Sequence, residues 1–331
     1  MSGIILIEND YQLFKEKKMK QKIKLFTSIA AVLLICLLSA CTSSKQQTKT
    51  TNSSTSFRLV TDSLGHKVKI PNHPKRIIGS YLEDYLIALG EIPVAQWSIG
   101  NGSVQTYLQK NLKNVPLISY DLPYEKVLSF EPDLLLMSSS AAVEGGKYEQ
   151  YNKIAPTYVV KNGNEITWEE QLKEIGKVLN KEIKAEKLIA NYQKQVKETK
   201  NELANKINGK SAAVLWVTNN SAFMVSQMRS SGRIIYEDLK FNVPSLVAKV
   251  SKKATSDWSA ISSEELAKLD ADYIILINSD KTATIFNEAT WKNLKAVKEN
   301  HVLEFGKNSS WLYNGPIASQ NMVKDIKSNL N

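Results

Sequence analysis

The stretch "TWEEQLKEIGKVLNKEIKAEKLIANYQKQVKETKNELANKI", residues 167–207, determines how the rest of the chain is organised. It contains one glycine and no proline, and its apolar side chains recur at spacings of three and four residues. This spacing is typical of amphipathic helices. It predicts one helix followed by a second, longer helix of about 25 residues, which would extend roughly 37 Å at 1.5 Å per residue.

On both sides of this helical stretch, short apolar segments alternate with amphipathic ones. The segments are 68–80, 81–90, 93–99, 124–130 and 132–139 before it, and 211–218, 232–241, 271–278 and 301–306 after it. Such alternation indicates α/β sheets that helices cover on both faces. We therefore expect two α/β lobes, an N-terminal one at 58–166 and a C-terminal one at 208–331, with the helices of 167–207 between them.

An internal repeat supports two equivalent lobes. "YEKVLSFEPDLLLM" (124–137) aligns with "SEELAKLDADYIILI" (263–277), since each contains a short amphipathic helix, an acidic residue, an aspartate and an apolar strand. The alignment places Glu125 of the first lobe opposite Glu264 of the second.

Residues 1–40 predict a secretory leader. A basic segment, "KEKKMKQKIK", precedes a short apolar run at 25–40, which is the order found in signal peptides. The run is shorter than the roughly 20 residues that a membrane-spanning helix needs. Met19 is an alternative start, because "MKQKIKLF" already supplies the basic segment.

The leader ends in "LSAC", and this ending resembles the lipobox of bacterial lipoproteins. The resemblance implies that Cys41 is lipidated, and several acyl chains together hold a protein on a membrane. Residues 41–57 then form a flexible tether. The lipid is expected to hold this tether at the outer face of the cell membrane of a Gram-positive bacterium. An uncleaved anchor or a chance cysteine is the alternative. Cys36 is removed with the leader, which excludes disulfides and cysteine-ligated zinc in the mature chain.

Charge and motifs exclude several classes of function. The formal net charge is +10, but the lysines are spread along the chain, and an exported protein is not expected to bind nucleic acid. The three histidines, His66, His73 and His301, do not have the spacing of metal ligands, so no direct metal site is predicted. No nucleophile elbow, zinc-protease motif or P-loop is present. We therefore expect a protein that is not an enzyme.

Several of these segments together resemble one family. The lipobox, "DSLGHKVKIPNHPKRIIGSYLEDYLIALG" (62–90), the long helix, "WKNLKAVKENHVLEF" (291–305) and "WLYNGP" (311–316) resemble the substrate-binding lipoproteins of bacterial iron–siderophore ABC importers. The resemblance extends from about residue 58 to the end of the chain. It implies two Rossmann-like α/β lobes joined by a single long rigid helix, with the ligand in a cleft between them and little closure. It also implies a monomer that delivers its ligand to a membrane permease powered by a cytoplasmic ATPase.

The resemblance further implies the class of ligand. A ferric siderophore holds its own iron, so the protein needs no cofactor and offers aromatic faces and a few donors to the chelate. A hydroxamate type is favoured. A ferric catecholate, a ferric citrate-type chelate, haem or cobalamin is the alternative within the family, and a surface hydrolase or adhesin on the same scaffold is a more distant one.

Site residues follow from the same resemblance. The expected ligand-binding residues are Trp258, Trp311, Tyr313, Arg229, Arg233, Trp97 and Tyr81. We expect only one of the two arginines to contact the ligand, and the alternative for each aromatic residue is core packing. Glu125 and Glu264 match the glutamates with which family members dock onto permease arginines. Their alternative role is to stabilise the first turn of a helix, as in a capping box that begins at Ser262.

Overall fold

The computed structural model describes residues 56–330 except Asn101 and Asn164. The predicted leader, Cys41 and the tether up to Thr55 lie outside the described residues. The described residues belong to one compact unit, and none of their helices combines the length and the apolar composition needed to cross a membrane.

The sheet of the N-terminal lobe is parallel. Its strands are β3 (Ile77–Ile78), β4 (Gln96–Ser98), β5 (Leu117–Ser119), β6 (Leu134–Met137) and β7 (Thr157–Val159). A bridge between Ile78 and Ala95 joins the pair β4–β5 to β3–β6–β7. All four side chains of β6 are apolar and buried, as expected of a strand covered on both faces.

Short helices cover this sheet. They are α2 (Glu83–Leu89), η1 (Thr106–Leu108), α3 (Gln109–Leu112), α4 (Tyr124–Ser129), η2 (Ser140–Val143) and α5 (Lys147–Ile154). Helix α2 ends at Gly90, whose φ of 83° forms a left-handed C-cap of the kind that glycine favours. The helix predicted at 81–90 is therefore confirmed, although it begins two residues later.

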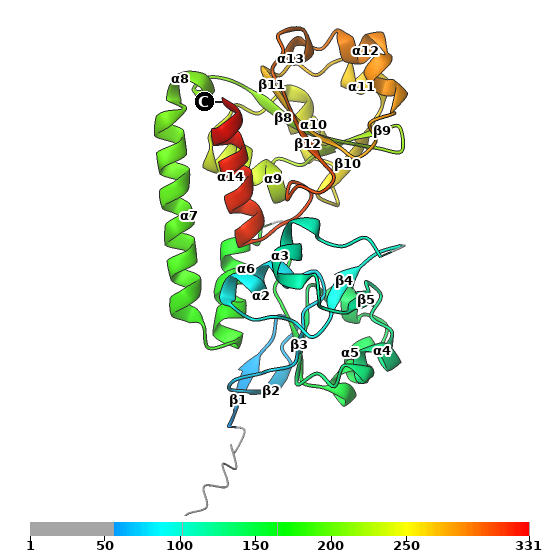
Figure 1. Ribbon diagram of the computed structural model, residues 1–331, viewed down its shortest axis with the longest axis vertical. Helices are drawn as coiled ribbons and strands as arrows, with labels where there is room; N and C mark the ends of the chain where they lie inside the picture. The colour runs from blue at the N-terminus through cyan, green and yellow to red at the C-terminus, as the bar shows by residue number, and fades with distance from the viewer. Residues whose placement is uncertain (1–55, 101, 164, 331) are drawn as a thin grey trace, which may run out of the picture. The chain divides into compact units, whose positions relative to one another are not determined.

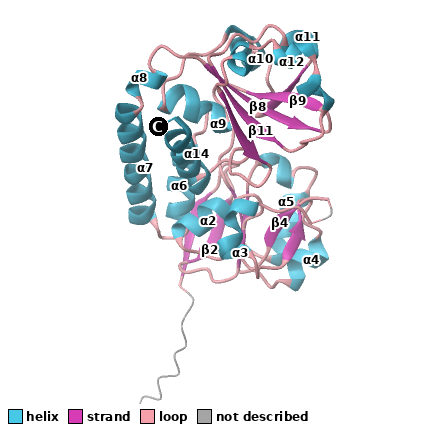
Figure 2. Cartoon of the chain, turned by 45° about the horizontal axis from the view of Figure 1, so that its top comes forward, coloured by secondary structure: helices cyan, strands magenta, loops and turns pink. Residues whose placement is uncertain are grey.

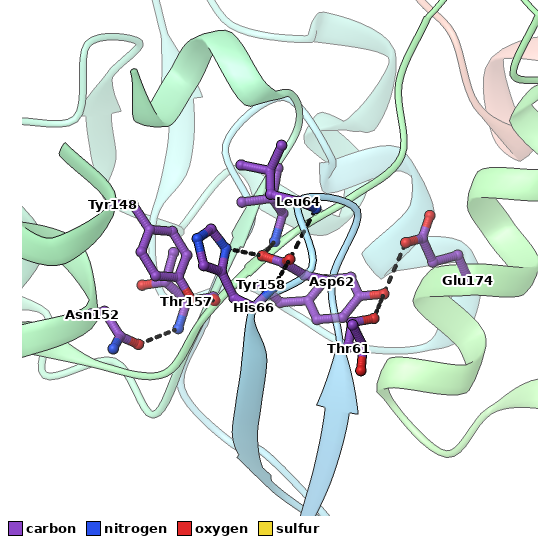
Figure 3. Close-up of polar contacts among 10 residues, drawn as sticks. Thr61, Asp62, Leu64, His66, Tyr148, Asn152, Thr157, Tyr158 and Glu174 are labelled. Carbon is purple, nitrogen blue, oxygen red and sulfur yellow. Dashed lines mark hydrogen bonds and ion pairs between the residues drawn. The ribbon is translucent and has the colours of Figure 1, made fainter. Parts of the chain in front are cut away.

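A buried carboxylate, that of Asp62, helps to attach the antiparallel hairpin of β1 (Phe57–Thr61) and β2 (Lys67–Pro71) to this lobe. Asp62 accepts hydrogen bonds from the backbone of Leu64 and His66 and contacts Nδ1 of His66 at 2.9 Å (Figure 3). The imidazole of His66 stacks on Tyr148 of α5 with 3.7 Å between ring centroids. The Asp62 carboxylate also accepts from the backbone of Val159 in β7. These contacts fix the start of the described chain against two elements of the lobe.

Helices α6 (Trp168–Val178), α7 (Glu182–Glu202) and α8 (Ala204–Ile207) occupy the stretch with helical periodicity. Helix α6 begins with a capping box between Thr167 and Glu170. Helix α7 has 21 residues and is shorter than the expected 25, because the chain leaves the helix at Leu203 and forms α8 as a separate turn.

Helix α7 contacts both lobes and runs beside them (Figure 1). At its start, Lys181 pairs with Glu91 of the N-terminal lobe at 2.8 Å. Near its middle, the hydroxyl of Tyr192 donates to Asp238 of the C-terminal lobe at 2.5 Å. The last helix, α14 (Pro316–Leu330), lies alongside α7. Helix α7 fits the single long helix that is expected to join the lobes, and α14 of the C-terminal lobe packs against α7 and α2.

The C-terminal lobe contains a mixed sheet in the order β10-β9-β8-β11-β12. Its strands are β8 (Ala212–Thr218), β9 (Ser221–Val225), β10 (Trp258–Ile261), β11 (Tyr273–Asn278) and β12 (Val302–Gly306). Its helices are α9 (Ser230–Arg233), the π-helix η3 (Ile234–Asp238), α10 (Ser245–Ser251), α11 (Ser263–Leu266), η4 (Thr284–Asn287), α12 (Ala289–Lys292) and α13 (Lys295–Lys298). Figure 2 shows helices around this sheet. The predicted fold class of two α/β lobes is confirmed.

The internal repeat corresponds to equivalent elements. In the first lobe α4 precedes β6, and in the second lobe α11 precedes β11. Both strands are interior strands with neighbours on each side, and every side chain of either is buried. The apolar run after each aspartate therefore forms the buried centre of a sheet.

Candidate functional site

A cavity of about 180 Å³ has lining residues from both lobes. The N-terminal lobe contributes Tyr81, Tyr85 and Asn162, and the C-terminal lobe contributes Arg229, Arg233 and Asp257. A second hollow shares Tyr81 with this cavity and is also lined by Trp97 and Tyr120. We refer to the two hollows together as the cleft. Three of the residues predicted for the ligand site, Tyr81, Arg229 and Arg233, line the cavity, and Trp97 lines the second hollow.

A row of four aromatic rings begins in the cleft, where Trp97 and Tyr81 line the hollows, and continues from Tyr81 to two rings that do not line them, Tyr313 and Tyr107. Trp97 and Tyr81 lie edge to face with 5.3 Å between centroids, Tyr81 and Tyr313 are 6.2 Å apart, and Tyr313 and Tyr107 are 5.3 Å apart. Tyr81 keeps 41% of its surface exposed. We call these four residues the aromatic row. Sequence reasoning missed Tyr107, because it lies in a single 3-10 turn with no periodicity to distinguish it.

The backbone is strained on both sides of the cavity. Tyr81 has a φ of 66° and Ser230 has a φ of 43°, both in the left-handed region that non-glycine residues rarely occupy. Each such residue costs on the order of 1–3 kcal/mol, and such strain concentrates at functional sites. The Ser230 hydroxyl donates to the carbonyl of Tyr313 at 3.2 Å, which links the arginine segment to the aromatic row.

Close packing of the backbone fixes the arginine segment. A Cβ on Gly232 would lie 2.1 Å from the carbonyl oxygen of Ser226, so only glycine fits at this position. Arg229 forms an ion pair with Asp257 at 3.3 Å, and Arg233 forms one with Glu237 at 3.2 Å. Both guanidinium groups therefore reach the cavity with a carboxylate beside them.

One buried carboxylate lies behind the aromatic row. Glu83 is 1% exposed, and its Oε1 accepts from the backbone N–H of Trp97 at 2.6 Å. Its Oε2 is buried without a hydrogen-bond partner among the described residues. Burial raises the pKa of Glu83 to about 7, because desolvation disfavours the charged form.

A second buried carboxylate joins the two lobes. Asp84 accepts from the backbone N–H groups of Ile317 at 2.8 Å and Ala318 at 2.9 Å, and from the hydroxyl of Tyr107 at 2.8 Å. Asp84 belongs to α2 and the two N–H groups belong to the first turn of α14, so a side chain of the N-terminal lobe caps this helix. Gly315 allows this approach, since a Cβ there would lie 2.6 Å from the carboxylate of Asp84. Burial raises the pKa of Asp84 to about 6.

The expectation that Trp311 faces the ligand is wrong. Trp311 is completely buried, stacks on Phe305 with 5.2 Å between centroids, and donates from Nε1 to Asp325 at 2.9 Å. It is a core residue that holds β12 against α14. Trp258 is the first residue of β10 and directly follows Asp257. Its ring packs on Trp216, with 5.9 Å between centroids, and is not part of the cavity lining.

The two glutamates of the repeat are exposed at the starts of equivalent helices. Glu125 lies in the first turn of α4, and Glu264 lies in the first turn of α11. The capping box of α11 pairs Ser262 with Glu265, so Glu264 is not the residue that closes it. Both helices lie on the side of the protein away from α7 (Figures 1 and 2). Within the described residues, no group of three His, Cys, Asp or Glu side chains is arranged to hold a metal ion.

Comparison with known proteins places this geometry in context. A family model described as periplasmic binding protein matches residues 84–308. The iron(3+)-hydroxamate-binding protein FhuD of Bacillus subtilis is 28% identical over 93% of this chain and 98% of its own length. The Fe(3+)-citrate-binding protein YfmC of the same organism is 27% identical over 92% of this chain and 96% of its own. The structure of FhuD2 from Staphylococcus aureus with bound ferrioxamine B superimposes with a TM-score of 0.66 at 25% identity, covering 78% of this chain and 98% of that one.

Proposed function

The chain belongs to the periplasmic binding protein family, a non-enzymatic solute-binding family, and on this basis we propose that it is the receptor of an ABC importer for a ferric siderophore of the hydroxamate type. The observation that carries this proposal is the aromatic row, which reaches a cavity lined from both lobes through Tyr81 and the adjoining hollow through Trp97. Aromatic faces beside a few polar groups suit a chelate whose outer shell is organic.

The charges of the cleft favour a hydroxamate over a more anionic chelate. Three hydroxamate groups carry one negative charge each and neutralise Fe³⁺, whereas three catecholates leave a net charge of −3. Arg229 and Arg233 each have a carboxylate partner, and the N-terminal lobe contributes no basic side chain to the cavity. A site with so little uncompensated positive charge fits a chelate that is neutral at its iron centre.

Delivery would use the face that carries Glu125 and Glu264. We propose that each glutamate pairs with an arginine of a membrane permease, one per lobe, and that a cytoplasmic ATPase powers uptake. Exposed charge pairs at the rim of an interface set its register and association rate. A lipid on Cys41 would keep the receptor, as a monomer, at the outer face of the membrane near this permease.

Charge reversal at both glutamates tests this role. Cells that carry the variant combining Glu125→Arg with Glu264→Arg should take up radiolabelled ferrioxamine B only at the background rate. The purified variant should bind ferrioxamine B with unchanged affinity. The control combines Glu186→Arg with Glu198→Arg, which makes the same change in net charge at exposed positions of α7.

Each outcome has one reading. Normal uptake by the first variant would reduce the two glutamates to residues of a helix start. Loss of binding in vitro would place them in the ligand site instead. Equal loss of uptake in the control would mean that total charge, and not the docking face, matters.

A further inference from the structure

We propose that Asp257 sets the charge selectivity of the cleft, so that the site prefers neutral or cationic ferric chelates to anionic ones. This inference rests on the proposed function, because it assumes that the cleft holds a ferric chelate. It goes further by assigning the discrimination between chelates to one carboxylate that no motif in the sequence identified.

The position of Asp257 suits such a role. Asp257 lines the cavity with 46% of its side chain exposed. Its backbone carbonyl accepts from the N–H of Ser226 at 2.9 Å, and the next residue begins β10. The carboxylate is therefore held by a strand end, and it remains accessible from the cavity.

The carboxylate also controls the nearest positive charge. Its Oδ1 accepts from Nη1 of Arg229 at 3.3 Å, and the Arg229 side chain is 19% exposed. An anionic ligand that approached Arg229 would have to share the guanidinium with Asp257 or displace it. A neutral ligand would meet the pair without disturbing its charge balance.

The influence of this charge extends across the cleft. Desolvation in the cleft raises the pKa of Tyr81, and the negative charge of Asp257 raises it further. Tyr81 belongs to the aromatic row on the opposite lobe. A ligand that stacks on Tyr81 would therefore lie in the field of Asp257.

The other charges do not provide an excess of positive charge. Arg233 has its own partner in Glu237, and the residues that the N-terminal lobe contributes to the cavity are uncharged. Ferrioxamine B adds one ammonium group to a neutral ferric trihydroxamate, whereas ferric citrate complexes are anionic. Asp257 would attract the first and repel the second.

The test compares these two chelates on the full mature chain. Intrinsic tryptophan fluorescence is titrated with ferrioxamine B and with ferric citrate for the wild type and for Asp257→Asn, which keeps the size of the side chain and removes its charge. We expect the ratio of the two affinities to shift by about 10-fold or more toward ferric citrate, as for the loss of one unit charge at close range. Asp257→Glu, which keeps the charge, should retain most of the wild-type preference.

A second carboxylate gives the matched control. Glu186→Gln removes an equal charge at an exposed position of α7 that does not line the cavity, so its ratio should shift much less. An unchanged ratio in Asp257→Asn, or an equal shift in Glu186→Gln, would overturn the assignment while leaving the receptor function intact. Failure of the wild type to bind either chelate would overturn the proposed function and this inference with it.

Discussion

Replacing Asp84 by alanine tests the contact that joins the two lobes. The substitution leaves two peptide N–H groups at the start of α14 and the hydroxyl of Tyr107 without their acceptor. Each buried donor without a partner costs about 1–3 kcal/mol. Removing the buried charge offsets this loss by about 3 kcal/mol, because burial raises the pKa of Asp84 from 3.8 to about 6 and each pKa unit corresponds to about 1.36 kcal/mol of free energy of unfolding. With the middle of the first range, the free energy of unfolding should fall by about 3 kcal/mol.

A double-mutant cycle with Gly315 isolates the contact itself. Gly315→Ala places a Cβ 2.6 Å from the Asp84 carboxylate at a φ of 140°, so alone it should destabilise by both collision and backbone strain. In the Asp84→Ala background the collision with the carboxylate is removed, and what remains is a tight contact with Cβ of residue 84 at 2.9 Å and a backbone strain of roughly 1 kcal/mol. Urea denaturation of the four proteins at pH 7 measures the coupling, which we expect to exceed about 1 kcal/mol. Additivity within about 0.5 kcal/mol would refute the account, as would an Asp84→Ala protein as stable as the wild type.

Three further predictions concern single residues. The folded-state pKa of Glu83 is about 7, against an ordinary value of 4.5, so its contribution to stability is complete below pH 4.5 and is lost as the pH rises through 7. Glu83→Gln should remove up to about 3 kcal/mol of this pH dependence. Urea denaturation profiles that are equal at pH 4.5 and pH 8 for both proteins would contradict this. Trp311→Ala should destabilise by about 3–5 kcal/mol, as for loss of a buried Trp, and weaker chelate binding at unchanged melting temperature would argue against a core role. Cys41→Ala should release the protein into the medium or leave it as a precursor, as judged by cell fractionation; membrane retention at mature size would exclude lipidation.

The parts of the fold that sequence predicted are those with local causes. Helix α4 begins after Pro123, α2 ends at Gly90, and Ser262 opens α11 with a capping box. Each signal acts within one turn of the chain, so periodicity and cap residues suffice to find it. The two interior strands could also be predicted from the sequence, since a continuous apolar run bounded by turns is typical of a buried strand.

The parts of the cleft that sequence could not predict depend on contacts between distant residues. Asp84 and Ile317 are 233 positions apart, and no local pattern at either residue indicates the other. Within "WLYN", Trp311 is buried and Tyr313 joins the aromatic row, because the packing of α14 decides which ring turns inward. The family resemblance therefore indicated the segment, whereas its orientation required the tertiary structure. Contact of Tyr81, Trp97 or Tyr313 with a ligand stays a prediction.

The central claim is that the aromatic row holds a ferric hydroxamate, and equilibrium titration of the purified chain with ferrioxamine B tests it most directly. The wild type should show saturable quenching of tryptophan fluorescence. Tyr81→Ala combined with Tyr313→Ala should weaken binding by about 5- to 150-fold, as for loss of about 1–3 kcal/mol at a desolvated contact. Phe57→Ala, which removes an exposed ring on β1, should bind as the wild type does. Absence of binding by the wild type, or undiminished binding by the double variant, would contradict the account.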